Sequence, residues 1–338
     1  MTALPYPRDL GFGMPAEWAP HARSWMMWPR RQAVWPDITA TRRAYRDVAH
    51  AIRGFEPLTM VVHPDDRAGA AHLLGADIEL MDWAIDDSWS RDAGPNFLVD
   101  AAGNKGAALF RFNAWGGKYA PFDGDASVGR QMTERAGARR FQSELVAEGG
   151  GISVDGEGTI LTTRSCFPNP NRNPGWTEAE IEQELKAMLG ADKVIWLPGN
   201  VEETETDGHV DGIAVFAAPG VVLVEGADDP YDPWHAIKQA NIDALRAATD
   251  AKGRKLRLIE LPEADESCMI GDRFCLSYVN AYLCNGGVIM PRYGIPRDDE
   301  VREIYADTFP DAQIVGVDII DIAVGGGGIH CITQQEPV

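Results

Sequence analysis

Short runs of β-branched and aliphatic residues recur along the chain, and most of them are bounded by Gly, Pro or Asp. Runs of this kind, ended by turn-forming residues, are typical of β-strands. The runs that predict strands are 58–62, 96–99, 107–112, 159–162, 194–197, 213–217, 221–224, 256–261, 288–290 and 314–317.

Segments with helical periodicity lie between these runs and cover 39–53, 65–74, 177–189, 233–249 and 298–308. The third begins with Thr177 and Glu180 at the spacing of a capping box, in which each side chain satisfies a backbone donor at the helix start. The mixture predicts an α/β or α+β fold. Because no glycine-rich phosphate loop follows an early strand, we expect no nucleotide cofactor.

No low-complexity linker divides the chain, and the segment Asn169 to Pro174 has the character of an ordered polar loop. We therefore predict one domain over residues 1–338. Strands and helices alternate at irregular spacing, and no internal repeat can be recognised from this pattern alone.

The composition of the chain indicates which classes of substrate or partner it can bind. The chain has 338 residues, of which 45% are hydrophobic, enough for a sizeable core. It carries 31 Lys and Arg against 51 Asp and Glu, which gives a formal charge of -20. This charge repels a phosphate backbone and attracts cations, so it disfavours nucleic acid and favours a small cationic substrate.

The cysteines and the chain start indicate a cytoplasmic protein. Without a C-x-x-C pair, neither a disulfide framework nor a thiolate zinc site is implied. Met1 to Pro15 lack a basic start followed by an apolar run, and no apolar stretch approaches ~20 residues, so we expect no membrane association. The five cysteines are Cys166, Cys268, Cys275, Cys284 and Cys331.

The glycine run Gly325 to Gly328, followed by Ile329, His330 and Cys331, is the first candidate for chemistry. Four consecutive glycines lose much conformational entropy on folding, so their presence indicates a close approach that side chains would prevent. A substrate beside Cys331 would explain it. The alternative is a flexible tail with a buried, inert cysteine. The apolar neighbours Ile329 and Ile332 favour an ordered strand end instead.

His209 and Asp211 are the second candidate. If this segment is extended, both side chains lie on the same face, because strand residues alternate. A histidine beside a carboxylate suits proton transfer near neutral pH. The alternatives are a structural histidine bonded to a loop aspartate, and a metal site of His209, Asp211 and a third ligand. Since no second histidine lies at ligand spacing, we expect no metal.

Asp92 is the third candidate, although its neighbour Arg91 also permits an ordinary surface ion pair. Trp89 precedes it, and a Gly-Pro turn follows, so a rigid acidic wall with an aromatic face is expected. Such a wall suits a planar cation, since carboxylates bind guanidinium in fork geometry and an aromatic ring adds a cation–π contact. A glycosidase using paired carboxylates is an alternative that leaves the glycine run unexplained. Its carboxylates would come from Asp86, Asp87 and Glu148.

The combination of motifs resembles the guanidine-modifying enzymes, and within them the agmatine deiminase branch of the Porphyromonas-type peptidylarginine deiminase family. The resemblance covers almost the whole chain. The chain departs from the commonest pattern at Gly328, where relatives often carry Asn, and at Gly151, where they often carry Ser. The motifs that carry the resemblance are Met14 to Trp18, Trp25 to Pro29, Asn113 to Gly117, Val154 to Thr159, Asn169 to Pro174 and Gly325 to Gln335.

The resemblance implies an α/β-propeller of the pentein type, with five ββαβ-type units around a pseudo-fivefold axis and a central site. It also implies that Cys331 is the nucleophile and that His209 is the general acid and base, oriented by Glu148. Asp92 and Asp211 would hold the guanidinium. The remaining residues implied to line the substrate pocket are Trp89, Trp115 and Glu205.

The implied reaction is hydrolysis of agmatine to N-carbamoylputrescine and ammonia through an amidino-cysteine intermediate, a step of polyamine metabolism that needs no cofactor. Relatives of this kind suggest a homo-oligomer. Two alternatives stay open at this point. In the first, the substrate is a peptidylarginine or another guanidine such as free arginine. In the second, the chain binds polyamines without catalysis.

Overall fold

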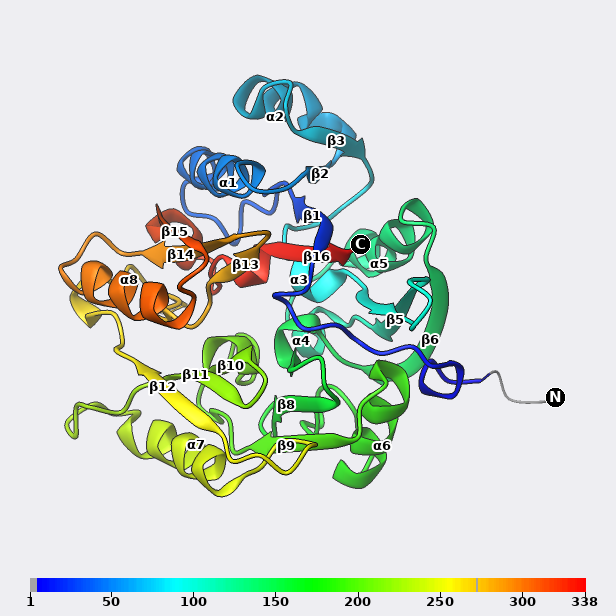
Figure 1. Ribbon diagram of the computed structural model, residues 1–338. Coiled ribbons are helices and arrows are strands. Elements are labelled where there is room, and N and C mark those ends of the chain that lie inside the picture. The colour runs from blue at the N-terminus through cyan, green and yellow to red at the C-terminus, as the bar shows by residue number, and fades with distance from the viewer. Residues whose placement is uncertain (1–4, 272) are drawn as a thin grey trace.

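Five small sheets surround a common centre in the computed structural model, which describes residues 5–271 and 273–338 (Figure 1). Within the described residues, one sheet has four strands and the others have three each. The ring of five units that the resemblance implied is thereby confirmed.

One pattern of strands builds each three-stranded sheet. In the unit that follows α3, β4 (Asn96–Val99) runs antiparallel to β5 (Lys105–Arg111), and β5 runs parallel to β6 (Arg139–Val146). The helix α5 (Asp123–Arg135) provides the crossover that a parallel pair requires. The other units are β7 (Ser153–Val154), β8 (Thr159–Thr163), α6 (Glu178–Leu189) and β9 (Lys193–Leu197); β10 (Ala214–Ala218), β11 (Val221–Glu225), α7 (His235–Ala247) and β12 (Arg257–Leu261); and β13 (Tyr282–Cys284), β14 (Gly287–Arg292), α8 (Arg297–Thr308) and β15 (Gln313–Asp318).

The two ends of the chain complete the remaining unit together. The C-terminal strand β16 (Thr333–Pro337) pairs antiparallel with β1 (His21–Met27), and β1 pairs parallel with β2 (Leu58–Val62) through α1 (Ile38–Arg53). The helix α2 (Arg67–Leu74) then leads to an additional strand, β3 (Glu79–Asp82). In Figure 1, β16 lies between β1 and the centre of the ring. Ring closure therefore places the segment before β16, which contains Cys331, at the centre.

Short helical turns fill the middle of the ring. The single turn α3 (Ser90–Ala93) contacts both η3 (Gly149–Gly151) and η6 (His330–Ile332), and η3 contacts η4 (Val210–Gly212). These turns come from different units, so the fold gathers residues that are far apart in the sequence. The other short elements are η1 (Arg8–Leu10), η2 (Pro64–Asp66), α4 (Ala114–Gly117), η5 (Glu266–Cys268) and α9 (Ile320–Ala323).

The predicted elements correspond well to the observed ones. Each predicted strand overlaps an observed strand, with ends shifted by one or two residues. The capping box is confirmed, since Thr177 Oγ1 accepts from the Glu180 backbone while the Glu180 carboxylate accepts from the Thr177 backbone. The helix predicted at 65–74 is divided into η2 and α2. The pattern missed α5 and the strands β1, β3, β6, β7, β13 and β16.

Apolar side chains from the helices and strands of the described residues pack into four clusters. The largest cluster joins the N-terminal unit to the C-terminal one and includes the fully buried Trp28, Tyr45 and Tyr282. Cys331 belongs to the same cluster. In the part of the chain that is described, no helix combines the length and the apolar character needed to cross a membrane.

Candidate active site

Five residues predicted from the sequence converge at the centre of the ring, and the structure buries each of them to 8% exposure or less. Asp92 is carried by α3, Asp211 by η4 and Cys331 by η6, while Glu148 and His209 immediately precede η3 and η4. Burial of so many ionisable groups requires mutual pairing or a bound counter-charge.

Gly150 lies next to the polar side-chain atoms of Asp92, His209 and Asp211. Its backbone N–H donates to Asp92 Oδ1 at 2.9 Å. A Cβ atom at this position would lie 2.6 Å from His209 Nδ1, 2.9 Å from Asp92 Oδ1 and 3.1 Å from Asp211 Oδ2. Glycine is therefore required here by close approach, and the two carboxylates and one imidazole surround a common point.

His209 and Asp211 do face the same site, but the predicted strand geometry is wrong. His209 precedes the 3₁₀ turn η4, and Asp211 lies within that turn. The 3₁₀ turn ends at Gly212, and β10 begins only at Ala214. The alternation of side chains along a strand therefore does not apply to His209 and Asp211. Both side chains are buried, as the functional interpretation required.

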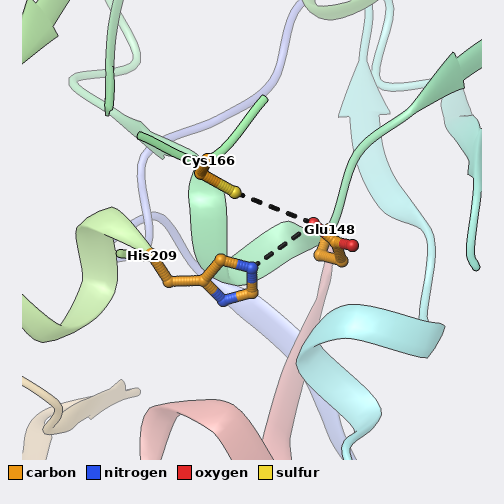
Figure 2. A group of neighbouring side chains, drawn as sticks. All are labelled: Glu148, Cys166 and His209. Atoms are coloured by element: carbon orange, nitrogen blue, oxygen red, sulfur yellow. Dashed lines mark hydrogen bonds and ion pairs between the residues drawn. The ribbon is translucent and has the colours of Figure 1, made fainter. Parts of the chain in front are cut away.

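Glu148 contacts one edge of the His209 ring (Figure 2). His209 Nε2 lies 3.3 Å from Glu148 Oε2, and Arg172 Nε donates to Glu148 Oε1 at 2.8 Å. Burial would raise the pKa of Glu148, but Arg172 and His209 lower it. Burial would lower the pKa of His209, yet Asp92 and other neighbours raise it well above its usual value. Glu148 is thus ionised and His209 protonated at neutral pH.

The second nitrogen of His209 is free. Among the described residues, Nδ1 is buried without a hydrogen-bond partner, and it lies 3.8 Å from Asp92 Oδ1. Since Glu148 occupies Nε2, Nδ1 is the atom that can exchange a proton with a substrate. This arrangement supports proton transfer and gives no indication of a purely structural histidine.

Cys166 lies on the same side of His209 as Glu148 (Figure 2). Its Sγ atom is 4.0 Å from Glu148 Oε2, and these two residues with His209 form a trio that could hold a metal ion. The donor set suits zinc. Arg172 already neutralises Glu148, however, and His209 is itself cationic, so a second cation would meet unfavourable charge. We infer a structural role for Cys166, whereas Glu148 and His209 serve proton transfer.

Cys331 lies against a polar wall. Its Sγ atom is 3.4 Å from Asn280 Oδ1 and 3.7 Å from Asp211 Oδ2. Burial, together with the negative charge of Asp211, raises the pKa of Cys331 well above its usual value. The free protein therefore holds a neutral thiol, and only an added positive charge can convert it to the nucleophilic thiolate.

The glycine run is ordered by close packing. Side chains placed at Gly325 and Gly327 would collide with the rings of Trp35 and Trp89, and one at Gly328 would meet the Asn280 side chain. Of the four, Gly326 alone has a positive φ, of 93°. The expected close approach is therefore present, but the groups that approach are three side chains of this chain, where a substrate was predicted.

A chain of alternating charges supports Asp211 from behind, and the sequence did not reveal it. His330 Nδ1 lies 2.7 Å from Asp211 Oδ2, and His330 Nε2 lies 2.8 Å from Glu17 Oε2. Arg91 approaches Glu17 at 3.7 Å and donates to Gln335 at 2.8 Å. The interpretation of Arg91 as a surface partner of Asp92 is therefore wrong, since Arg91 is buried and pairs elsewhere.

Aromatic residues form a narrow pocket on one side of Cys331. Trp89, Trp115 and Glu205 line it, as the resemblance implied. Trp115 Nε1 donates to Asp92 Oδ2 at 2.9 Å, and Tyr119 donates to Glu205. Trp115 has a φ of 55°, which is unusual for a residue with a side chain. This strained position aims its indole N–H at Asp92.

The carboxylates proposed for a glycosidase do not form a pair. Asp87 is buried and bonded to Arg31 at 3.2 Å, while Asp86 accepts from the Gly124 backbone at 2.8 Å. Asp86 therefore anchors the start of α5, Asp87 pairs with Arg31, and Glu148 belongs with His209. The arrangement supports a structural role for Asp86 and Asp87.

Replacing Glu17 with glutamine is expected to lower the melting temperature by about 5 °C at pH 6. Burial would raise the pKa of Glu17, but His330 and Arg91 lower it to about 2, from 4.5. A depressed pKa contributes stability that is present above pH 4.5 and is lost as the pH falls toward 2. The difference between the wild type and the variant should therefore narrow across this range, as measured by thermal unfolding.

The exposed Glu303 on α8 provides the control, and Glu303→Gln should leave the melting temperature unchanged at each pH. A constant difference between the wild type and Glu17→Gln from pH 6 to pH 3 would contradict the linkage to Glu17.

Comparisons with known proteins show the family to which the chain belongs. The family model for Porphyromonas-type peptidyl-arginine deiminase matches residues 13–337. The agmatine deiminase of Stutzerimonas stutzeri is 41% identical, over 99% of this chain and 98% of its own. The solved agmatine deiminase of Enterococcus faecalis is 36% identical, covers 99% of this chain and 98% of its own, and superposes with a TM-score of 0.94.

A more distant protein shares the fold. DDAH from Pseudomonas aeruginosa is 15% identical, with a TM-score of 0.54 and coverage of 94% of this chain and 100% of its own, and this likeness shows the shared fold alone. The match to the family model spans nearly the entire chain, and the curated relative matches over almost its full length. The chain therefore belongs to the Porphyromonas-type peptidyl-arginine deiminase family.

Proposed function

We propose that this chain is an agmatine deiminase, which hydrolyses agmatine to N-carbamoylputrescine and ammonia. The observation that carries the proposal is the grouping of Cys331 Sγ with the carboxylates of Asp92 and Asp211 and the free Nδ1 of His209. Full-length relatives from Stutzerimonas stutzeri and Enterococcus faecalis named as agmatine deiminases support the choice of substrate.

The guanidinium group would lie between Asp92 and Asp211. Each carboxylate retains acceptor capacity toward the common point beside Gly150, and guanidinium offers donors in a fork that matches carboxylate geometry. Asp211 is ionised because His330 lowers its pKa against the effect of burial. A buried anionic site of this kind favours a planar cation over a neutral urea.

The substrate's positive charge would activate its own nucleophile. In the free protein, burial and Asp211 hold Cys331 as a thiol. A guanidinium adds a cation within reach of Sγ, which lowers the pKa of the thiol and offsets the nearby carboxylates. The thiolate then attacks the guanidinium carbon and forms the C–S bond of a tetrahedral adduct.

His209 would move the protons of both half-reactions. In the first, it donates its proton to the departing nitrogen, the C–N bond breaks, ammonia leaves, and an amidino-cysteine remains. In the second, neutral His209 accepts a proton from water as the oxygen bonds to the same carbon. The C–S bond then breaks, the product carries a ureido group, and the hydroxyl proton of the adduct passes to the sulfur and restores the thiol. The proton that the thiol released to solvent before the attack leaves with ammonia as ammonium.

The carbon chain and amine of agmatine would extend into the aromatic pocket. Trp89 and Trp115 provide apolar faces for methylene groups, and Glu205 provides a carboxylate for the terminal ammonium. The formal charge of -20 further favours a dication over arginine, which carries its own carboxylate.

A substrate panel tests the proposal. Ammonia release should be fastest with agmatine, and kcat/KM for free arginine and for a blocked arginine peptide should be lower by about 10²-fold or more. Acid quench during turnover should trap the amidino adduct on Cys331. Faster release from the peptide would assign a peptidylarginine deiminase, and binding of agmatine without ammonia release would assign a polyamine-binding protein. An adduct on Cys166 or Cys284 would refute the nucleophile.

Three further properties complete the proposal. Pairing of β16 with β1 supports a single catalytic domain over the whole chain. The agmatine substrate and the free cysteines support a cytoplasmic role in polyamine metabolism. A homo-oligomer is expected from relatives, and light scattering of the purified protein at several concentrations tests it.

A further inference from the structure

A second cavity reaches Cys331 beside the aromatic pocket. It has a volume of about 320 Å³ and extends between η4, α7 and the segment 273–277. The two cavities share Glu205, Thr206, Gly326 and Cys331, so they adjoin beside the nucleophile. We refer to the second one as the side cavity.

The catalytic groups are divided between these two spaces. Trp89, Asp92 and Trp115 line the aromatic pocket, whereas His209 and Asp211 line the side cavity. Among the described residues, neither set lines both spaces. The proton-transferring side chain therefore faces the side cavity, and the groups suited to the substrate's carbon chain face the aromatic pocket.

This division matters for the second half-reaction. After ammonia leaves, the carbon chain of the amidino adduct still fills the narrow aromatic pocket. Water must nevertheless reach the adduct carbon within hydrogen-bond distance of His209. Because His209 protonates the departing nitrogen and later deprotonates the water, ammonia and water occupy the same side of the carbon in turn.

We propose that the side cavity is the route by which ammonia leaves Cys331 and by which the hydrolytic water arrives. The proposal rests on the function proposed above and adds to it a path for the second substrate, water. Each turnover exchanges one ammonia for one water through this space, and the ureido product leaves afterwards through the aromatic pocket.

The lining of the side cavity agrees with this use. It contains the amide side chains of Asn200 and Asn280 and the hydroxyl of Ser277, which can bind water in succession. Glu225, Glu263 and Lys238 lie in the same lining, and Lys238 forms an ion pair with Glu263, so the charges in this part of the cavity are largely balanced. The side cavity thus offers polar partners for water and ammonia within a lining that also contains apolar side chains.

Two positions allow the side cavity to be narrowed without touching the catalytic groups. A Cβ atom at Gly212 would meet no heavy atom within 4 Å, and the φ angle there is not positive, so the backbone at this position accepts a side chain such as leucine. Ile237 on α7 lies partly exposed at the same cavity and can be replaced by tryptophan. The two positions belong to different elements, so a fold defect common to both variants is not expected.

The experiment measures the two half-reactions separately by rapid acid quench and mass spectrometry, with agmatine. In Gly212→Leu and Ile237→Trp, the rate of adduct formation should stay within about twofold of the wild type, while adduct hydrolysis slows by about tenfold or more. The adduct on Cys331 then accumulates in the steady state, and kcat falls without a rise in KM.

Ala236→Trp is the matched control, because Ala236 is the exposed neighbour of Ile237 on α7 and does not line the cavity in the described residues. It should leave both half-reactions unchanged. A rise in KM with slower adduct formation in both cavity variants would overturn the proposal and place the carbon chain in the side cavity. Unchanged hydrolysis in both would also overturn it. Absence of any adduct in the wild type would instead refute the proposed function.

Discussion

Replacing Cys331 with alanine is expected to lower kcat for ammonia release from agmatine by about 10⁴-fold or more. The thiolate forms the covalent bond that divides the reaction into two half-reactions, and no oxygen or nitrogen atom nearby occupies the same position. Asp211 Oδ2 lies 3.7 Å from the sulfur, but it is bonded to His330. Cys331→Ser should fail as well, because burial beside Asp211 keeps a hydroxyl protonated.

The alanine variant should still fold and bind agmatine, since Ile329 and Ile332 on either side of it remain fully buried. Circular dichroism and calorimetry with agmatine check both expectations. Cys284→Ala is the control, because Cys284 is a buried cysteine of β13 that, within the described structure, lines neither the aromatic pocket nor the side cavity, and turnover should continue. Ammonia release by Cys331→Ala at the wild-type rate would eliminate the cysteine mechanism.

The chemical groups of this site could be predicted from the sequence because each lies in a locally unusual segment. Cys331 follows the glycine run, and His209 and Asp211 lie in an acidic, glycine-bounded stretch. Their mutual geometry could not be predicted, because it depends on turns such as η4 that lack a periodic pattern. The strand geometry expected for His209 and Asp211 was wrong for this reason, although the shared orientation of the side chains was right.

The supporting residues could not be found from sequence spacing. Glu17 and His330 are separated by 313 positions and meet only because β16 returns to pair with β1. Antiparallel pairing between the chain ends leaves no local signal in either segment. The helix α5 was missed for a different reason. Its apolar residues, Val128 and Met132 among them, are isolated between polar residues and glycine, so they form no clear helical pattern.

The two departures from the commonest family pattern have local explanations in this chain. At Gly151, a Cβ atom would lie 2.4 Å from the ring of Phe167, and at Gly328 it would lie 2.6 Å from Asn280 Oδ1. Asn280 also accepts hydrogen bonds from the backbone N–H groups of His330 and Cys331. The neighbours of these glycines therefore fill the space that a larger side chain would need.

Replacing Asp92 with asparagine is expected to reduce kcat/KM for agmatine by about 10² to 10³-fold, even though the side chain keeps its size. The carboxylate accepts from Gly150 N–H on one oxygen and from Trp115 Nε1–H on the other. An amide has a single acceptor oxygen, so its NH₂ group would face one of these donors. The substitution also removes a negative charge that the guanidinium requires.

The pH profile separates this role from simple loss of packing. Burial lowers the pKa of His209, and the carboxylate of Asp92 is the largest opposing influence. Without that carboxylate, the pKa of His209 falls, so the alkaline limit of activity should move to lower pH. Trp115→Phe is the control, because it removes one donor and keeps the charge, and it should lower kcat/KM by at most about tenfold without moving the alkaline limit. A near-normal kcat/KM for Asp92→Asn would show that Asp211 alone binds the guanidinium.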